Sequence, residues 1–209
     1  MHTLNYTTAG KDIREADKAL IMLHGRGGSA EDILSLADAL PVGDFAIFAP
    51  QAAAHSWYPY SFLMPPAKNE PWLSSALDVL QQLVDVIGSQ AIAPEQLYFL
   101  GFSQGACLTL EFITRNARRY GGAVAFTGGL IGDRIYPRHY KGDFEGTPVF
   151  IGTGDPDPHV PVGRVHDTTA FLKGMNALVT EKVYPGMGHT ISEDELRQAG
   201  RLLLDASYT

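Results

Sequence analysis

A strand, a tight turn and a helix are predicted around residues 101–105, which read Gly-Phe-Ser-Gln-Gly. The apolar residues 97–100 precede the turn, and the helix-like residues 106–113 follow it. Glycines at both ends let the strand and the helix pass closer than side chains would allow. The bend exposes the Ser103 hydroxyl, and it places the Gln104 amide at a helix N-terminus, where developing negative charge is stabilised. The pattern therefore predicts a serine nucleophile.

Length and composition favour one globular domain, residues 1–209. The chain has 45% hydrophobic residues, and no repeat or linker divides it. Its formal net charge is −7 and its basic residues are scattered, which argues against a nucleic-acid partner. A single cysteine, Cys107, rules out a disulfide within the chain, and we expect it to be a buried packing residue.

The sequence contains no segment that is typical of secretion or membrane insertion. Residues 1–5 do not begin a basic and then apolar leader. No apolar run approaches the roughly 20 residues that a membrane-spanning helix needs. We therefore expect a cytoplasmic protein with no integral membrane segment.

Short apolar runs alternate with helix-length segments along the chain. Strands are predicted at residues 19–23, 44–49, 97–100, 122–126, 148–152 and 180–184, with residues 4–9 as an added antiparallel edge strand. Helices are predicted at residues 30–40, 73–87, 104–115, 162–178 and 192–204. This alternation predicts a three-layer α/β fold, with a mostly parallel central sheet flanked by helices.

A serine hydroxyl needs a base and a group that orients the base before it can react at neutral pH. Parallel sheets place such groups just after the carboxyl ends of strands. Asp155 and Asp157 follow the strand at 148–152, and His189 follows the strand at 180–184. The order serine, acid, histidine is that of α/β-hydrolases. Both aspartates precede a proline, so their chemistry alone does not separate them.

The other histidines fit the role of base less well. His2, His55, His139 and His166 do not directly follow a strand, and His159 lies on the same loop as the acid. His24 follows the first buried strand, and we expect it to hold its loop through a hydrogen bond. The same loop supplies an oxyanion donor in such folds, so the backbone amides of Arg26 and Gln104 are the predicted oxyanion hole.

Four segments, taken together, resemble the phospholipase/carboxylesterase family of α/β-hydrolases, which includes the acyl-protein thioesterases. They are residues 23–28, 101–105, 154–161 and 186–189, and they span most of the chain in the family's order. The resemblance implies an α/β-hydrolase fold. Its D-x-x-V-P pattern aligns Asp157, rather than Asp155, with the family's acid. It therefore implies a triad of Ser103, Asp157 and His189.

Residues 51–72 form a long aromatic connection, and residues 130–147 form a long polar one. We predict that Trp57 and Tyr58, together with Met187 beside the histidine, contact the substrate. A flap over the site, packing against the core, and the interface of a homodimer remain alternatives for residues 51–72.

The leading hypothesis is a serine hydrolase that cleaves small-molecule carboxylic esters through an acyl-enzyme. Small to medium acyl esters, lysophospholipids and thioesters are the substrates considered. We expect no cofactor and no metal, since the chain shows no zinc-like spacing of ligands. A serine peptidase or acyltransferase with the same triad is an alternative, as is a non-catalytic binding protein of this fold.

Overall fold

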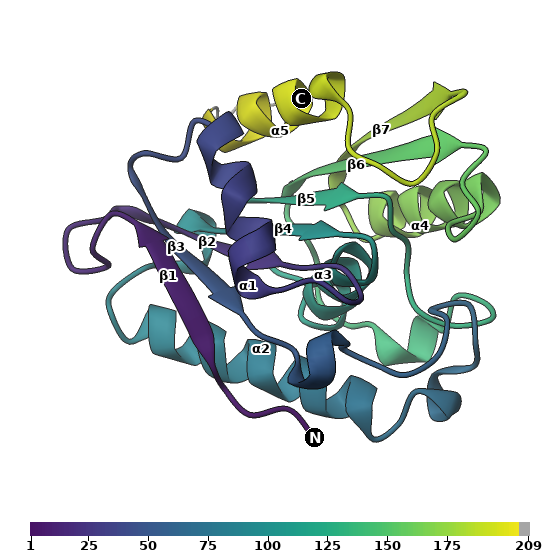
Figure 1. The fold of residues 1–209 in the computed structure, drawn as a ribbon, viewed down its shortest axis with the longest axis horizontal. Coiled ribbons are helices and arrows are strands. Elements are labelled where there is room, and N and C mark those ends of the chain that lie inside the picture. Colours follow the sequence, from purple (N-terminus) through teal and green to yellow (C-terminus); the bar gives the residue numbers. More distant parts are fainter. Residues whose placement is uncertain (205–209) are drawn as a thin grey trace.

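A seven-stranded sheet forms the centre of the molecule in the structure, a computed structural model that describes residues 1–204. The strand order is β1-β3-β2-β4-β5-β6-β7, and β1 alone runs antiparallel to its neighbour (Figure 1). The strands are β1 (Tyr6–Gly10), β2 (Lys18–Leu23), β3 (Phe45–Pro50), β4 (Leu97–Phe102), β5 (Gly122–Phe126), β6 (Pro148–Asp155) and β7 (Leu178–Pro185). The predicted mostly parallel α/β sheet is confirmed, as is its antiparallel edge strand.

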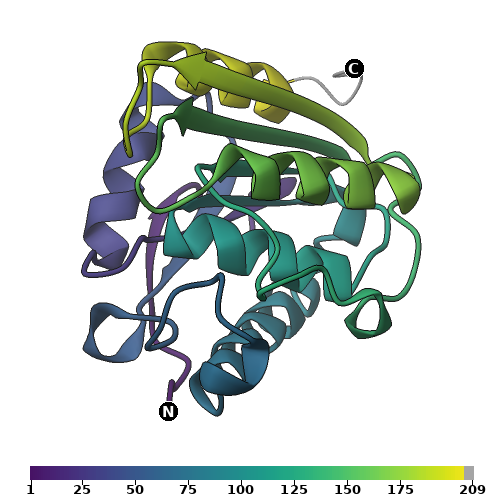
Figure 2. The ribbon, with the colours of Figure 1, turned by 90° about the vertical axis from the view of Figure 1, so that its right-hand side faces the viewer.

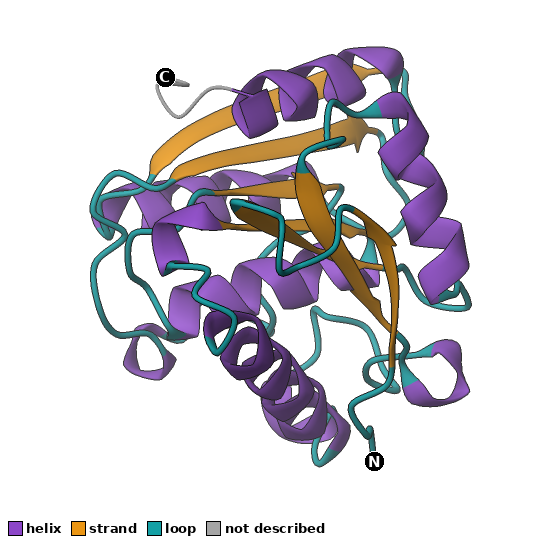
Figure 3. Cartoon of the chain, turned by 90° about the vertical axis from the view of Figure 1, so that its left-hand side faces the viewer, coloured by secondary structure: helices purple, strands orange, loops and turns teal. Residues whose placement is uncertain are grey.

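Helices cover both faces of the sheet (Figures 2 and 3). The α-helices are α1 (Ala30–Leu34), α2 (Trp72–Gly88), α3 (Gln104–Arg115), α4 (Val162–Gly174) and α5 (Glu193–Leu204). Buried residues of α2, α3 and α4 pack on one face, and buried residues of α1 and α5 pack on the other. Short 3-10 helices lie in the connections: η1 (Ser35–Ala39), η2 (Ala53–His55), η3 (Pro66–Lys68), η4 (Pro94–Gln96) and η5 (Pro137–His139).

Two predicted helices are shorter than the sequence indicated. The helix expected to reach residue 178 ends at Gly174, because Asn176 takes a left-handed φ of 63° and the chain turns directly into β7. The helix expected at 30–40 is α-helical only to Leu34 and then continues as the 3-10 helix η1. Ser29 caps this helix, with its hydroxyl accepting from the Asp32 amide in a capping box.

The inner strands are apolar on both faces because both faces are covered. In β4, Leu97 and Phe99 pack toward α2 and α3, whereas Tyr98 and Leu100 pack toward α1 and α5. All four side chains are at most 3% exposed. Alternate side chains of one strand thus enter the two cores on opposite faces of the sheet. The inner strands are continuously apolar in sequence for this reason.

The corner between β4 and α3 is closely packed. A Cβ on Gly101 would clash with the backbone of Gly105, and a Cβ on Gly105 would clash with the carbonyl oxygens of Leu23 and His24. Between the two glycines, Ser103 adopts a φ of 55° and a ψ of −116°, a conformation that a side chain strains. The close approach of α3 to β2 therefore sets the position of Ser103.

We predict that Gly105→Ala destabilises the protein by about 1–3 kcal/mol, because the added methyl group has no space against β2. Urea unfolding of the variant and the wild type measures this difference. Gly163→Ala is the matched control, since a Cβ there would meet no atom within 4 Å. In α4 this control should leave stability unchanged or raise it by up to about 1 kcal/mol. Equal stability of the Gly105 variant and the control would contradict the packing argument.

Candidate active site

Three side chains from separate loops meet at the carboxyl edge of the sheet. Nε2 of His189 lies 2.7 Å from Oγ of Ser103, and Nδ1 of His189 lies 2.8 Å from Oδ2 of Asp157. Ser103 follows β4, Asp157 follows β6 and His189 follows β7. Because these strands are parallel, their carboxyl ends open at the same edge of the sheet. The three residues predicted as a triad are thus in one hydrogen-bonded chain.

The partners of His189 fix which of its nitrogens carries the proton. A carboxylate can only accept, so Nδ1–H donates to Asp157. Nε2 of the neutral imidazole is then free to accept from the Ser103 hydroxyl. This is the tautomer that a histidine needs in order to remove a proton from serine.

The Asp157 carboxylate is held from two sides. Its side chain is fully covered, and its Oδ1 accepts from the backbone amides of His159 at 2.7 Å and Val160 at 2.9 Å. Burial by itself raises the pKa of Asp157, but the two amides and the imidazole of His189 outweigh burial and hold this pKa below its usual range. The carboxylate therefore stays ionised at neutral pH. Asp155 instead ends β6 in an exposed position, and its backbone oxygen accepts from Gly186.

Two aromatic rings pack against the imidazole of His189. The Phe102 ring lies 5.2 Å from it between centroids, and the His159 ring lies 4.9 Å from it, edge to face. Together with the bond to Asp157, these contacts restrict the rotation of His189. The imidazole is therefore preorganised toward Ser103.

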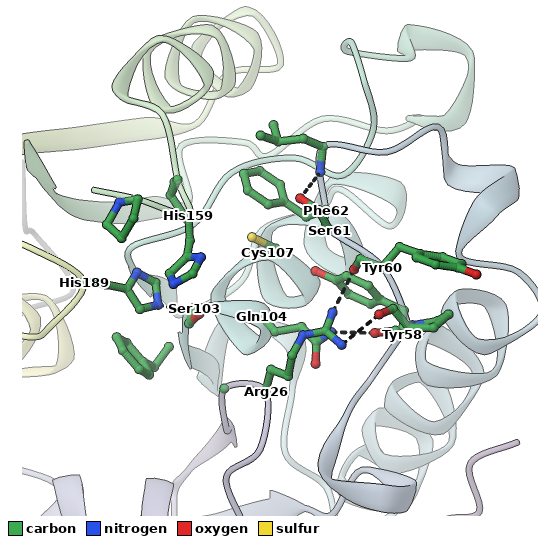
Figure 4. A pocket seen from close by; sticks show the side chains of 16 residues that line it. Arg26, Tyr58, Tyr60, Ser61, Phe62, Ser103, Gln104, Cys107, His159 and His189 are labelled. Atoms are coloured by element: carbon green, nitrogen blue, oxygen red, sulfur yellow. Dashed lines mark hydrogen bonds between the residues drawn. The ribbon is translucent and has the colours of Figure 1, made fainter. Parts of the chain in front are cut away.

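Gln104 and Arg26 have a role that sequence reasoning missed, because it considered only their backbone amides. Oε1 of Gln104 accepts from the Trp57 amide at 2.9 Å, and Nε2 donates to the Tyr58 carbonyl at 2.8 Å. The Arg26 guanidinium donates to the Pro59 and Tyr60 carbonyls at 3.0 and 2.7 Å (Figure 4). The two side chains fasten the aromatic segment to the predicted oxyanion loops. The sequence indicated this role only in that both predicted oxyanion donors belong to residues with long polar side chains.

His24 holds its loop, as predicted. Its Nε2 accepts from the Ala52 amide at 3.1 Å, so Nδ1 carries the proton and donates to the Gly25 carbonyl at 2.7 Å. The ring also packs on Trp57 with centroids 5.0 Å apart. Burial lowers the pKa of His24, which keeps the imidazole neutral. Gly25 in turn lies against Ser103, since a Cβ on it would be 3.4 Å from the Ser103 Cβ.

A cavity of about 800 Å³ opens beside Ser103. It is lined by residues 25–26, 58–63, 102–104, Cys107, 158–160 and His189. Tyr58 borders the cavity, and its contact with the substrate stays a prediction. Trp57 and Met187 are not among the lining residues: Trp57 is fully buried and donates to the His24 carbonyl, and the Met187 backbone packs against Gly154.

The aromatic connection both packs on the core and borders the cavity. Trp57, Tyr58 and Phe62 are buried, whereas Tyr60 is 57% exposed at the rim. Cys107 is buried one helical turn after Ser103, and burial raises the pKa of its thiol to about 12. A thiol of that kind is inert at neutral pH, which agrees with a packing role.

No three His, Cys, Asp or Glu side chains among residues 1–204 lie close enough together to hold a metal ion. Over the same residues, no helix combines the length and the apolar character needed to cross a membrane.

Comparison with known proteins places these features in a family. Residues 5–204 match the model of the phospholipase/carboxylesterase family. Acyl-protein thioesterase 1 of Saccharomyces cerevisiae is 29% identical over 92% of this chain and 94% of its own length. A probable carboxylesterase SOBER1-like protein of Arabidopsis thaliana is 30% identical, but the match covers 62% of this chain and half of that protein. A phospholipase/carboxylesterase structure from Dyadobacter fermentans is 54% identical, with a TM-score of 0.96 over 98% of both chains.

The fold and the family match define a hydrolase of the α/β-hydrolase class. The chain belongs to the phospholipase/carboxylesterase family. The structure of Arabidopsis thaliana SOBER1, 20% identical with a TM-score of 0.77, shares the fold.

We predict that Asp157→Asn lowers kcat by 100-fold or more, because the amide no longer selects the tautomer of His189 or stabilises its cation. Asp155→Asn is the matched control, since its exposed carboxylate does not bond His189. Steady-state kinetics on a simple ester measures both variants. Equal losses in both would contradict the assignment of the acid.

The same variant has a predicted effect on stability that depends on pH. The pKa of Asp157 is lower in the folded protein than the value of about 3.9 expected when unfolded. The carboxylate therefore stabilises the fold above about pH 4, and this contribution is lost as the pH falls through the folded pKa. The free energy of unfolding of Asp157→Asn should be lower than that of the wild type at pH 7. The difference between the two should become smaller as the pH is lowered below about 4. A gap that is constant with pH would contradict this.

Proposed function

We propose that the protein is a serine hydrolase that cleaves carboxylic esters through an acyl-enzyme, with Ser103 as nucleophile, His189 as base and Asp157 as the orienting acid. The observation that carries this proposal is the continuous hydrogen-bond chain from Ser103 through His189 to Asp157, with contacts of 2.7 and 2.8 Å, beside a cavity. Membership of the phospholipase/carboxylesterase family supports the ester as the bond cleaved.

The first half of the reaction would form the acyl-enzyme. His189 takes the proton of Ser103 as the hydroxyl oxygen attacks the ester carbonyl, and Asp157 stabilises the imidazolium that forms. The tetrahedral oxyanion would be held by the backbone amides of Gln104 and Arg26. Donors of this kind contribute about 3 kcal/mol each to transition-state stabilisation.

Collapse of the tetrahedral intermediate breaks the bond to the alcohol, and His189 returns the proton to the leaving oxygen. Water then attacks the acyl-enzyme with the same imidazole as base, which releases the acid and restores Ser103. No step requires a group beyond the chain and water. Relatives called acyl-protein thioesterase support thioesters as a second substrate class for the same chemistry. A cytoplasmic location and a homodimer remain predictions from the sequence.

Ser103→Ala should lower kcat/KM for p-nitrophenyl butyrate by 1,000-fold or more, since Ser103 is the hydroxyl that bonds His189 among residues 1–204. A fluorophosphonate probe should label the wild type at Ser103 and should leave the variant unlabelled. Ser89→Ala, an exposed serine at the end of α2, is the matched control and should retain activity and labelling.

The outcomes separate the alternatives. Retained hydrolysis in Ser103→Ala would remove the serine from the mechanism. A wild-type protein that neither labels nor turns over any ester would be a binding protein of this fold. Faster cleavage of a matched anilide than of the ester would indicate a peptidase.

A further inference from the structure

The cavity is free of acidic side chains although the chain as a whole is acidic. The protein has 23 acidic and 16 basic residues. Of the lining residues that the structure describes, none is Asp or Glu, whereas Arg26, His159 and His189 are all present. The carboxylate of the proposed triad, Asp157, is covered by protein and bonded to His189. A protein with net charge −7 thus keeps a locally positive or neutral cavity.

Arg26 carries the permanent charge in this cavity, and that charge is unpaired. Its guanidinium donates to Ser56 Oγ and to the carbonyls of Pro59 and Tyr60, which are all neutral. The ion pairs found within residues 1–204 do not include Arg26. A guanidinium has five N–H donors, so three bonds leave it further hydrogen-bonding capacity. Its side chain is anchored, yet its charge is available to an anion in the cavity.

The position of Arg26 relative to His189 shows which part of an ester it would meet. His189 must protonate the leaving oxygen, so the alcohol part of the substrate lies on the side of His189. Figure 4 shows His189 and His159 on one side of Ser103, with Arg26 and Tyr58 on the other. The side of Arg26 and Tyr58 is thus left to the oxyanion and to the acyl part.

The environment of Arg26 also suits a polar acyl group. The guanidinium lies 6.0 Å from the centre of the Tyr58 ring. The Tyr58 hydroxyl is buried and interacts with the side chain of Cys107. Arg26 is itself exposed, so an anion from solvent can reach it without opening the core. A wall made only for a hydrocarbon chain would not place these groups together.

We propose that the cavity selects ester substrates whose acyl group ends in a carboxylate, that is, monoesters of dicarboxylic acids, and that Arg26 pairs with this carboxylate. The inference rests on the proposed function, because the acyl side is defined by catalysis at Ser103. A carboxylate matches the planar fork of a guanidinium and is the anion that it binds in two-point geometry. Arg26 is thus a specificity-determining residue as well as the anchor of residues 56–60.

The test compares two esters that differ in charge and little in shape. Monoethyl glutarate ends in a carboxylate, and ethyl 5-oxohexanoate has a neutral methyl ketone in the same place. Wild-type kcat/KM should be at least tenfold higher for the anionic ester at low salt. The ratio of the two kcat/KM values should decrease when the NaCl concentration is raised from 0.05 to 0.5 M, because salt screens a pairing at an exposed site. A wild-type preference for the neutral ester would overturn the inference.

Variants of Arg26 then assign the preference to its charge. Arg26→Gln should reduce the ratio of anionic to neutral kcat/KM by tenfold or more. Arg26→Lys should give an intermediate ratio, because it keeps the charge but loses the two-point fork. The ratio cancels any general loss of activity from a loosened segment. Arg14→Gln is the control for net charge, since Arg14 is exposed and paired with Asp12 outside the cavity, and it should leave the ratio unchanged. A ratio that is the same in Arg26→Gln and the wild type would overturn the assignment.

Failure of this inference is distinguishable from failure of the proposed function. Hydrolysis of both esters with a ratio indifferent to Arg26 rejects only the inference. Hydrolysis of neither ester, with no labelling of Ser103, rejects the proposed function, and the inference falls with it. If Arg26→Gln does not fold, the salt dependence of the wild-type ratio decides alone: a ratio that salt does not change rejects the pairing.

Discussion

The backbone of Gly105 is pressed against the carbonyl oxygens at the end of β2, and the rest of the site depends on this contact. It brings the first turn of α3 beside the loop that contains Arg26. It also forces Ser103 into a left-handed φ, which directs the hydroxyl out of the sheet edge. Because β2, β4, β6 and β7 are parallel, the loops carrying the acid and the histidine emerge at that same edge. Strain at one corner and a shared strand direction are therefore enough to assemble residues far apart in sequence.

Arg26 and Gln104, at this corner, each have one role for the backbone and another for the side chain. In the proposed mechanism the backbone amides of Arg26 and Gln104 bind the oxyanion. Their side chains hydrogen-bond to residues 56–60 and hold that segment in place. A mutation of either side chain would therefore affect both the wall of the cavity and the loop that holds the amide. This coupling explains why an aromatic segment with little regular structure can form a fixed wall: its backbone polar groups are satisfied by side chains from the neighbouring loops.

The sequence was sufficient for the sheet, the serine turn and the order of the three site residues, because each depends on local pattern. Apolar runs such as 97–100 predict a buried strand, and a strand followed by a polar loop predicts a site at its end. The end of α4 was misplaced because the apolar residues Met175, Ala177 and Leu178 continue the helical pattern, whereas the chain makes a left-handed turn at Asn176. The side-chain bonds of Gln104 and Arg26 were not predictable for the same reason: their partners lie 30 to 48 residues away. The choice between Asp155 and Asp157 likewise needed the resemblance or the fold, since both precede a proline.

The charged and titratable groups distinguish the two sides of the cavity, which its shape alone does not. His189 defines the side on which a leaving alcohol must lie, because it has to deliver a proton there. The opposite side holds a fixed guanidinium with neutral partners, beside the buried ring of Tyr58. In an acidic protein, long-range repulsion works against an anionic substrate, so a site for such a substrate needs a local positive charge that is not already neutralised. Arg26 meets that condition, because its hydrogen bonds hold it in place without cancelling its charge.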